Sequence, residues 1–244
     1  ASASPCQSAF FRLLLPVDGP LTMKLYNYFR SSASFRVRIA LHIKGLPYDY
    51  LPVHLLRGEH HDPAYASLVG DALVPALVTD EGAVLPQSMA IMEYLEELHP
   101  SPALLPNTPL ARARVRALAQ MVACEIHPLN NPRVLKYLTG TLGADEEAKT
   151  TWYRHWVRQG LEAFERQLGL LAHERAAAGL APSVYCWGDA PMLADCCLVP
   201  QVFNGKRFDV NLDGLPLTMA AFDACMALPA FQQAQPSVCP DNAA

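Results

Sequence analysis

Residues 23–41 read Met-Lys-Leu-Tyr-Asn-Tyr-Phe-Arg-Ser-Ser-Ala-Ser-Phe-Arg-Val-Arg-Ile-Ala-Leu, and this stretch decides the fold of the chain. Residues 24–28 predict a short strand, and the amphipathic period that follows predicts a helix over residues 34–44. Ser31 and Ser32 lie between the two, where N-cap residues occur. A helix start presents unpaired N–H groups and the positive end of the macrodipole, so it favours an anion.

Residues 29–32, here called the elbow, carry two hydroxyl groups that allow two interpretations. A hydroxyl at a helix start can donate to a thiolate, which is the reactive form of a thiol. The two serines can also do no more than cap the helix. The elbow alone does not distinguish a capping role from a role toward a thiolate, so other features of the chain are needed to choose between them.

Composition excludes several classes of protein. The chain has 244 residues, of which 51% are hydrophobic and 17% charged, and this is typical of a globular protein rather than a disordered one. Its formal net charge is −4 and its pI is about 6.1, so no basic surplus exists to neutralise nucleic-acid phosphates. Clusters of arginine can still bind a small anionic ligand.

Cysteine usage and the N-terminal segment indicate where the protein works. The seven cysteines contain no C-x-x-C pair, which argues against a disulfide framework and against a structural metal site. We therefore expect a cytoplasmic protein with no metal. Residues 1–22 contain a short apolar run that Arg12 interrupts, too short to span a membrane and a poor secretory signal. We expect this segment to be a non-functional extension, with Met23 as the natural start.

The first third of the chain alternates strands and helices. After the elbow we expect, in order, strand 48–55, a polar loop 57–62, helix 63–68, strand 73–79, a turn 80–82, strand 83–85 and helix 88–98. Ser88 is the expected cap of the last helix. This order predicts a mixed sheet with helices on both faces.

Only helical periods follow a proline-rich connector at residues 101–109. The expected helices are 111–139 (interrupted near Pro128 and Pro132), 146–172, 189–203 with Pro191 in its first turn, and 216–227. In the helix 146–172 we expect the core stripe Trp156, Leu161, Phe164 and Leu168. The chain therefore divides into a small α/β domain and an all-helical domain.

Two more features of the α/β domain suit a peptide ligand. Val74-Pro75 lies at the mouth of a strand, where a cis bond would aim the backbone N–H and C=O of Val74 outward to pair with an extended peptide. The sequence does not decide whether this bond is cis or trans. Gln87-Ser88 opens a second helix and offers a second anion site. A short peptide with a thiol and a carboxylate fits two helix starts and a strand edge, and glutathione is such a peptide.

These motifs resemble the zeta-class glutathione transferases, the family that includes maleylacetoacetate and maleylpyruvate isomerases. The resemblance rests on residues 28–41, which contain the elbow, on Val74-Pro75, on residues 87–97, on Leu104-Leu105-Pro106 and on residues 194–202 of the helical domain. It covers nearly the whole chain beyond the extension.

The resemblance implies a thioredoxin-like domain at residues 23–103, a linker at 104–110, an all-α domain at 111–236, and a homodimer. It also implies that glutathione is the cofactor. By the same likeness Ser31 faces the glutathione sulfur, Val74 pairs with the peptide backbone, Gln87 and Ser88 hold the γ-glutamyl end, and His60 lies at the glycyl end.

Residues 126–133 resemble the bacterial maleylpyruvate isomerases more than the animal maleylacetoacetate enzymes. The likeness implies that Arg133, with Arg30 and Arg207, binds the carboxylates of a substrate, and that His127 and Asn131 reach the glutathione. Arginine suits this task because its donors bind a carboxylate in a bidentate manner.

Three positions depart from the family pattern. Ala33 stands where many members have cysteine, and Val69-Gly70-Asp71 replaces the usual Asn-Pro stretch before the Val-Pro strand. Met192 occupies the place of a Thr or Ser cap, a loss expected to cost about 0.5–2 kcal/mol of helix stability. None of the three removes a residue expected to act in catalysis.

The leading hypothesis is a glutathione-dependent cis–trans isomerase of a maleyl dicarboxylate, of the kind that serves aromatic catabolism. Ser31 and Arg30 are its expected catalytic residues, with no nucleic acid and no membrane as partners. The first alternative is a general glutathione transferase or dehalogenase, which would need an apolar pocket instead of converging arginines. The second is a non-enzymatic binding protein of the same fold. The sequence does not choose between maleylpyruvate and maleylacetoacetate.

Overall fold

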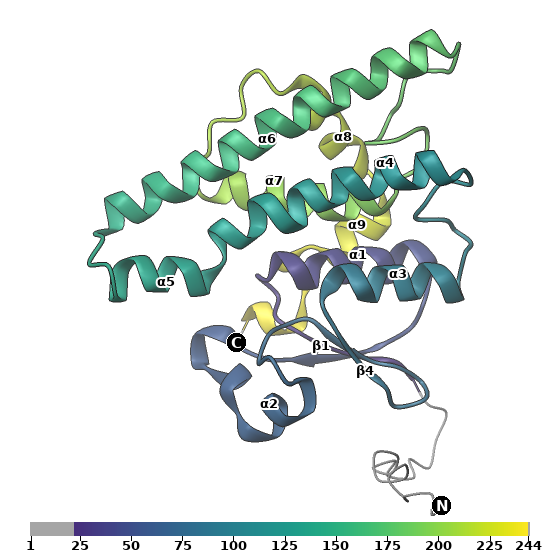
Figure 1. Ribbon diagram of the computed structural model, residues 1–244. Coiled ribbons are helices and arrows are strands. Elements are labelled where there is room, and N and C mark those ends of the chain that lie inside the picture. Colours follow the sequence, from purple (N-terminus) through teal and green to yellow (C-terminus); the bar gives the residue numbers. More distant parts are fainter. Residues whose placement is uncertain (1–21, 244) are drawn as a thin grey trace, which may run out of the picture.

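The computed structural model describes residues 22–243. The expected extension 1–22 therefore lies, apart from Thr22, outside the described residues. A small sheet with its helices comes first, and a larger group of helices packs on top of it (Figure 1). The predicted order, an α/β part followed by an all-helical part, is confirmed.

The sheet has four strands in the order β2-β1-β3-β4. They are β1 (Lys24–Asn27), β2 (Asp49–Pro52), β3 (Ala76–Val78) and β4 (Val84–Pro86). Strand β1 pairs in parallel with β2 and antiparallel with β3, so Leu25 lies between Tyr50 and Leu77. Strands β3 and β4 form the predicted hairpin. The mixed sheet expected from the sequence is confirmed.

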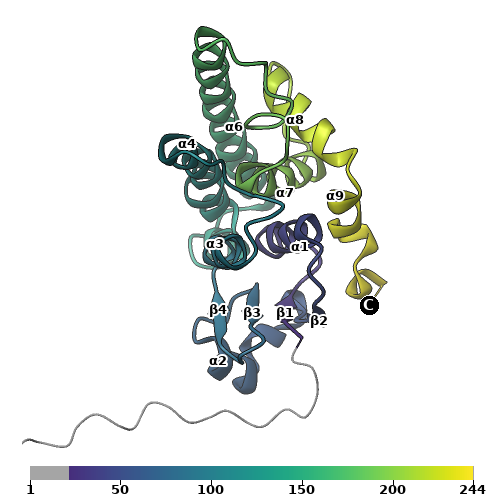
Figure 2. The ribbon, with the colours of Figure 1, turned by 90° about the vertical axis from the view of Figure 1, so that its right-hand side faces the viewer.

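Helices cover both faces of this sheet (Figure 2). They are α1 (Ser32–Lys44), α2 (Pro63–Val69) and α3 (Ser88–Leu98). Helices α1 and α3 lie side by side between the sheet and the helical part, and α2 lies on the other face. The polar loop expected at residues 57–62 contains two short 3₁₀ turns, Leu55–Arg57 and Glu59–His61.

The second part is helical throughout. Its helices are α4 (Pro109–Gln120), α5 (Pro132–Gly140), α6 (Glu146–Ala177), α7 (Leu193–Arg207), α8 (Pro216–Met226) and α9 (Pro229–Ala234). A π turn and a 3₁₀ turn separate α4 from α5, at Met121–Ile126 and His127–Asn130. The predicted interruption near Pro128 and Pro132 is confirmed. Helix α9 was not expected from the sequence.

One apolar core joins the two parts, and α7 lies at its centre. Phe35 of α1 meets Phe203 of α7 edge to face, with ring centroids 5.9 Å apart. Phe35 is 2% exposed, and burying a side chain of this size contributes roughly 1.5–3 kcal/mol. The core therefore fixes the elbow before α1 relative to the helical part.

The core stripe predicted for α6 is partly wrong. Leu161, Phe164 and Leu168 are buried as expected, but Trp156 is only half-buried. Tyr153 and Val157 continue the buried stripe in its place, because they fall on the same face of the helix as Leu161. Trp156 lies beside Trp152 instead, edge to face at 5.6 Å.

The predicted bounds of the third long helix, residues 189–203, are wrong at both ends. Helix α7 spans Leu193–Arg207, so Pro191 lies before the helix, and Met192 is its N-cap residue. The buried Asp195 carboxylate accepts from the Met192 N–H at 2.8 Å and from the Cys186 N–H at 2.9 Å. Asp195 thereby satisfies two backbone donors of the segment that precedes α7, although the N-cap residue has no Thr or Ser side chain.

Candidate active site

The start of α1 places Ser31 as a true N-cap. Its backbone is extended at φ −71° and ψ 120°, and its Oγ accepts from the Ser34 N–H at 3.2 Å. The N-cap prediction is thus confirmed for Ser31. Because its oxygen is already an acceptor, the Ser31 hydroxyl keeps its own proton to donate elsewhere.

Ser32 has a different place from the one expected. It is the first residue of α1 rather than a cap, and its side chain is buried. Its Oγ accepts from Asn204 Nδ2 of α7 at 2.5 Å. This bond ties the elbow to the helical part, and the sequence analysis did not single out Asn204, which follows the motif at residues 194–202.

Arg30 and Arg207 both lie near this tie. Arg207 lies one turn after Asn204, and both arginines are exposed. Each guanidinium lies over a ring, Arg30 over Phe29 at 4.8 Å and Arg207 over Phe208 at 5.1 Å. Burial raises the pKa of Tyr28, and the charges of Arg30 and Arg207 both lower it, which places them in one neighbourhood.

The Val74-Pro75 peptide bond, left open by the sequence, is cis. Val74 is half-buried and precedes β3. Among residues 22–243, no hydrogen bond uses the backbone N–H or C=O of Val74. Both groups are available to an extended peptide added at this edge.

The start of α3 is built differently from that of α1. Its N-cap is Gln87, at φ +70° and ψ 112°, and no side chain caps it. A positive φ at a residue other than glycine is a strained conformation that occurs often at functional sites. The expectation that Ser88 caps this helix is wrong, because Ser88 is already helical. The Gln87 side chain instead points back to Asp71, with Nε2 3.5 Å from Oδ2.

Arg36 lies directly behind Ser88, and sequence reasoning missed it. Its Nη1 donates to Ser88 Oγ at 3.2 Å, and its side chain is 2% exposed. Its Nε and Nη2 have no partner in the described part of the chain. Burial lowers the pKa of Arg36, because a charged group is costly to remove from water. The α3 start thus has a positive charge behind it, and a hydroxyl whose proton points away from Arg36.

His127 and Arg133 form the opposite side of the site. Burial, Arg36 and Arg133 lower the pKa of His127 to about 3, so its ring is neutral near pH 7. Arg133 is exposed on the first turn of α5. Asn131 is the N-cap of α5, with Oδ1 accepting from the Arg133 N–H at 3.1 Å, so its amide Nδ2 keeps both protons for a ligand.

His60 lies in the 3₁₀ turn Glu59–His61, next to His61 at a ring distance of 3.9 Å. Its Nδ1 is buried without a partner among the described residues. Burial lowers the pKa of His60, and the charges of His61 and Lys136 lower it further. Since Lys136 belongs to α5, this turn and α5 lie near each other.

The site is therefore a set of donors with few acceptors. Within residues 22–243, none of Arg30, Arg133 and Arg207 forms an ion pair. Two helix starts, a free strand edge and three free guanidinium groups suit a peptide with a thiol and a carboxylate, together with a second, anionic molecule. Across the same residues no cluster of His, Cys, Asp and Glu could hold a metal ion, and no helix is long and apolar enough to cross a membrane.

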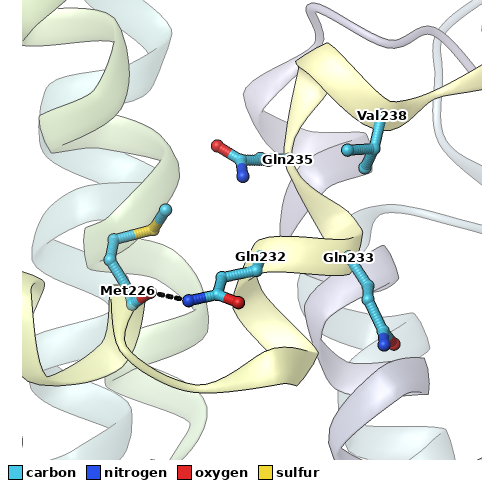
Figure 3. Close-up of a pocket in the computed structure, with 5 residues that line it drawn as sticks. All are labelled: Met226, Gln232, Gln233, Gln235 and Val238. Atoms are coloured by element: carbon cyan, nitrogen blue, oxygen red, sulfur yellow. Dashed lines mark hydrogen bonds between the residues drawn. The ribbon is translucent and has the colours of Figure 1, made fainter.

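A hollow beside α8, α9 and the residues that follow α9 lacks this chemistry. It has a volume of about 550 Å³ and is lined by Met226, Gln232, Gln233, Gln235 and Val238 (Figure 3). None of these side chains carries a charge, so they offer nothing to neutralise a dicarboxylate.

Comparison with known proteins finds relatives over most of the chain. The family model "Glutathione S-transferase, N-terminal domain" matches residues 30–98. A maleylpyruvate isomerase of Ralstonia is 50% identical over 222 residues, covering 91% of this chain and 100% of that protein. A maleylacetoacetate isomerase of Pseudomonas aeruginosa is 50% identical over 224 residues, again covering 91% and 100%.

Solved structures give the same result. The holo structure of a maleylpyruvate isomerase, described as a bacterial zeta-class glutathione S-transferase, has a TM-score of 0.82 at 48% identity and covers 89% of this chain and 99% of its own. A maleylacetoacetate isomerase of Anaeromyxobacter dehalogenans with glutathione bound in its active site has a TM-score of 0.78 at 40% identity, covering 91% and 98%.

Proposed function

The chain belongs to the family of maleylpyruvate and maleylacetoacetate isomerases within the zeta-class glutathione transferases, and from this premise we propose how its own residues work. It is a glutathione-dependent cis–trans isomerase that converts a maleyl dicarboxylate to its fumaryl isomer. The proposed roles rest on one observation above all: Ser31 caps α1 with its proton free, beside two arginines without ion-pair partners.

The donor set fits glutathione. The free N–H and C=O of Val74 would pair with the peptide backbone, and the α3 start with Gln87 and Ser88 would hold the γ-glutamyl carboxylate. Arg36 supports this place from behind, because it occupies one lone pair of Ser88 and adds a buried positive charge. His60, His127 and Asn131 would hold the remaining polar groups of the tripeptide.

When bound, glutathione supplies a thiol that can add reversibly to a cis double bond, which lets the bond rotate. The Ser31 hydroxyl and the α1 start lower the pKa of such a thiol, because both favour the charged form. The Ser31 hydroxyl would donate its proton to the sulfur in a hydrogen bond.

Arg30, Arg133 and Arg207 hold the substrate. A maleyl dicarboxylate carries two carboxylates, and charge-assisted bonds to guanidinium groups fix both of them. Arg30, next to Ser31 in the chain, stabilises the negative charge that develops on the reacting end of the substrate. His127 stays neutral beside Arg133, so it can donate or accept without adding to the local charge.

The organisation of the whole chain follows from these roles. Residues 23–103 bind glutathione, 104–110 form the linker, and 111–236 supply most of the substrate pocket. We also assign a homodimer in the cytoplasm, without a nucleic-acid or membrane partner. The dimer is checked by analytical ultracentrifugation, in which a single species at the mass of one chain, 26.7 kDa, contradicts it.

The enzyme assay compares maleylpyruvate and maleylacetoacetate, each with and without glutathione. We expect turnover only with glutathione, and a rise of about 10- to 100-fold in KM for the dicarboxylate in Arg133→Ala. Arg166→Ala is the matched control, since Arg166 is exposed on α6. Turnover of both substrates unaffected in Arg133→Ala contradicts the role of Arg133. Activity on electrophilic halides with no isomerisation contradicts the isomerase and supports a general transferase.

A further inference from the structure

The last residues of the chain leave the helical part and return to the sheet. After α9 the chain passes through residues 236–243, here called the C-terminal strap, which contains the 3₁₀ turns Pro236–Val238 and Pro240–Ala243. The strap runs down beside α1 and ends next to β2 (Figure 2).

Asp241 binds the elbow directly. Its Oδ2 accepts from the Phe29 N–H at 3.1 Å, and its Oδ1 accepts from the Tyr50 hydroxyl at 2.5 Å. Asp241 is 5% exposed, and its bond to the Phe29 N–H is buried. A carboxylate with both oxygens bonded is a strong acceptor, and its removal leaves the buried Phe29 N–H and the half-buried Tyr50 hydroxyl without this partner.

A second tie connects the end of α9 to the same peptide. Arg38 of α1 donates from Nε to the Ala234 carbonyl at 2.9 Å and from Nη2 to the Phe29 carbonyl at 3.0 Å. The Phe29 residue is thus held at its N–H by Asp241 and at its C=O by Arg38. Phe29 precedes Arg30 and Ser31, so the two groups on which the proposed chemistry depends follow a residue fixed at both ends.

Apolar contacts hold the strap in place. Cys239 forms a small separate core with Tyr28 and Phe29, apart from the main core. The charge of Asp241 also raises the pKa of Tyr28, while Arg30 and Arg207 lower it, so the strap lies within range of the proposed substrate arginines. The elbow is therefore packed, bonded and electrostatically coupled to the end of the chain.

We propose that the C-terminal strap positions Ser31 and Arg30 for catalysis, with Asp241 as its positioning residue. This inference rests on the roles proposed above for Ser31 and Arg30. In this role the strap acts on the Phe29 backbone rather than on the ligand. It fixes the Phe29 peptide so that the Ser31 hydroxyl keeps its direction, and small displacements of such a group can reduce turnover severely.

The test compares Asp241→Ala with Tyr50→Phe and with Asp223→Ala, an exposed acidic position on α8. We expect Asp241→Ala to lower kcat about tenfold. The apparent pKa of the bound thiol, read from the dependence of kcat on pH, should rise by about half a unit. The glutathione KM should change by less than about threefold, because the α3 start is untouched. Tyr50→Phe keeps the Phe29 bond and should show a smaller effect, and Asp223→Ala none.

Hydrogen exchange gives a readout that does not depend on activity. In Asp241→Ala, amide exchange should rise in the peptide that contains Phe29 and Ser31 but not in the peptide that covers α3. If Asp241→Ala does not fold, Asp241→Asn and Tyr50→Phe are measured in the same way.

The outcomes separate the two proposals. A wild-type enzyme without glutathione-dependent isomerisation contradicts the proposed function. The hydrogen-exchange experiment still tests whether Asp241 holds the segment that contains Phe29 and Ser31. An active wild type that loses turnover in Ser31→Ala, but keeps its kcat, pH profile and exchange pattern in Asp241→Ala, contradicts the strap alone. A lower melting temperature with unchanged kinetics per folded molecule also contradicts it, since this shows a purely structural role.

Discussion

The starts of α1 and α3 both face the site, but they are built in opposite ways. The α1 start is capped by Ser31 in an ordinary extended conformation. The α3 start has no side-chain cap, a strained Gln87 at φ +70°, and the buried Arg36 behind it. A capped start has one donor fewer to offer, and an uncapped start leaves its N–H groups free.

The difference suggests a division of labour. At α1 a single hydroxyl proton and the macrodipole act on one atom, which suits a thiolate. At α3 several free N–H groups and a buried cation surround a larger anion, which suits a carboxylate. If the two helix starts act differently, substitutions at each should change different measured quantities.

Removal of the Ser31 hydroxyl should have the largest effect. Ser31→Ala removes both the cap and the donor to sulfur, and we expect kcat to fall about 100-fold. The loss of the cap alone costs about 1 kcal/mol of stability, which does not reduce activity in a folded enzyme. Steady-state kinetics with saturating glutathione measure the effect. Ser67→Ala, at an exposed position of α2, serves as control, and an equal loss in both variants refutes the role.

Replacement of Arg36 should separate affinity from stability. Arg36→Met removes a buried charge with unpaired N–H groups, and an apolar side chain of similar length is often neutral or stabilising by about 1–4 kcal/mol at such places. We expect unchanged or higher stability in urea, together with a glutathione Kd about tenfold weaker by calorimetry. Arg166→Met is the exposed control. A large loss of stability with unchanged Kd would show that Arg36 serves the fold and not the α3 start.

The smallest effect concerns His127 and pH. Its pKa is lowered from 6.5 to about 3, so below pH 6.5 the unfolded chain binds a proton that the folded chain does not. His127 therefore reduces stability as pH falls from about 6.5 towards 3. His127→Gln should remove about 1–2 kcal/mol of the stability loss between pH 7 and pH 5. Urea unfolding at the two pH values measures it, and identical pH dependence in both proteins contradicts the shifted pKa.

The α1 start was predictable from sequence because its signals are local. A polar pair before an amphipathic period indicates a cap, and Ser31 is one. The alternation of strands and helices likewise predicted the mixed sheet, and Pro128 and Pro132 predicted the break between α4 and α5. Each of these features depends on residues close together in the chain.

The α3 start could not be predicted in the same way. Ser88 has the residue type of a cap, but the backbone at Gln87 takes a positive φ that no local pattern indicates. Arg36 and Ser88 are 52 residues apart, and Asp241 is 212 residues from Phe29. Such partners become visible only when the fold brings them together. The short helix α9 was missed for a similar reason, since its single buried face depends on packing against α1.

The most direct test of the division of labour measures the pKa and the Kd of bound glutathione in Ser31→Ala and in Ser88→Ala. Ultraviolet absorbance of the thiolate gives the pKa, and calorimetry gives the Kd. We expect Ser31→Ala to raise the thiol pKa by about one unit with little change in Kd. Ser88→Ala should weaken the Kd about tenfold and leave the thiol pKa unchanged. Two variants that change both quantities equally would show that the helix starts act as one undivided site.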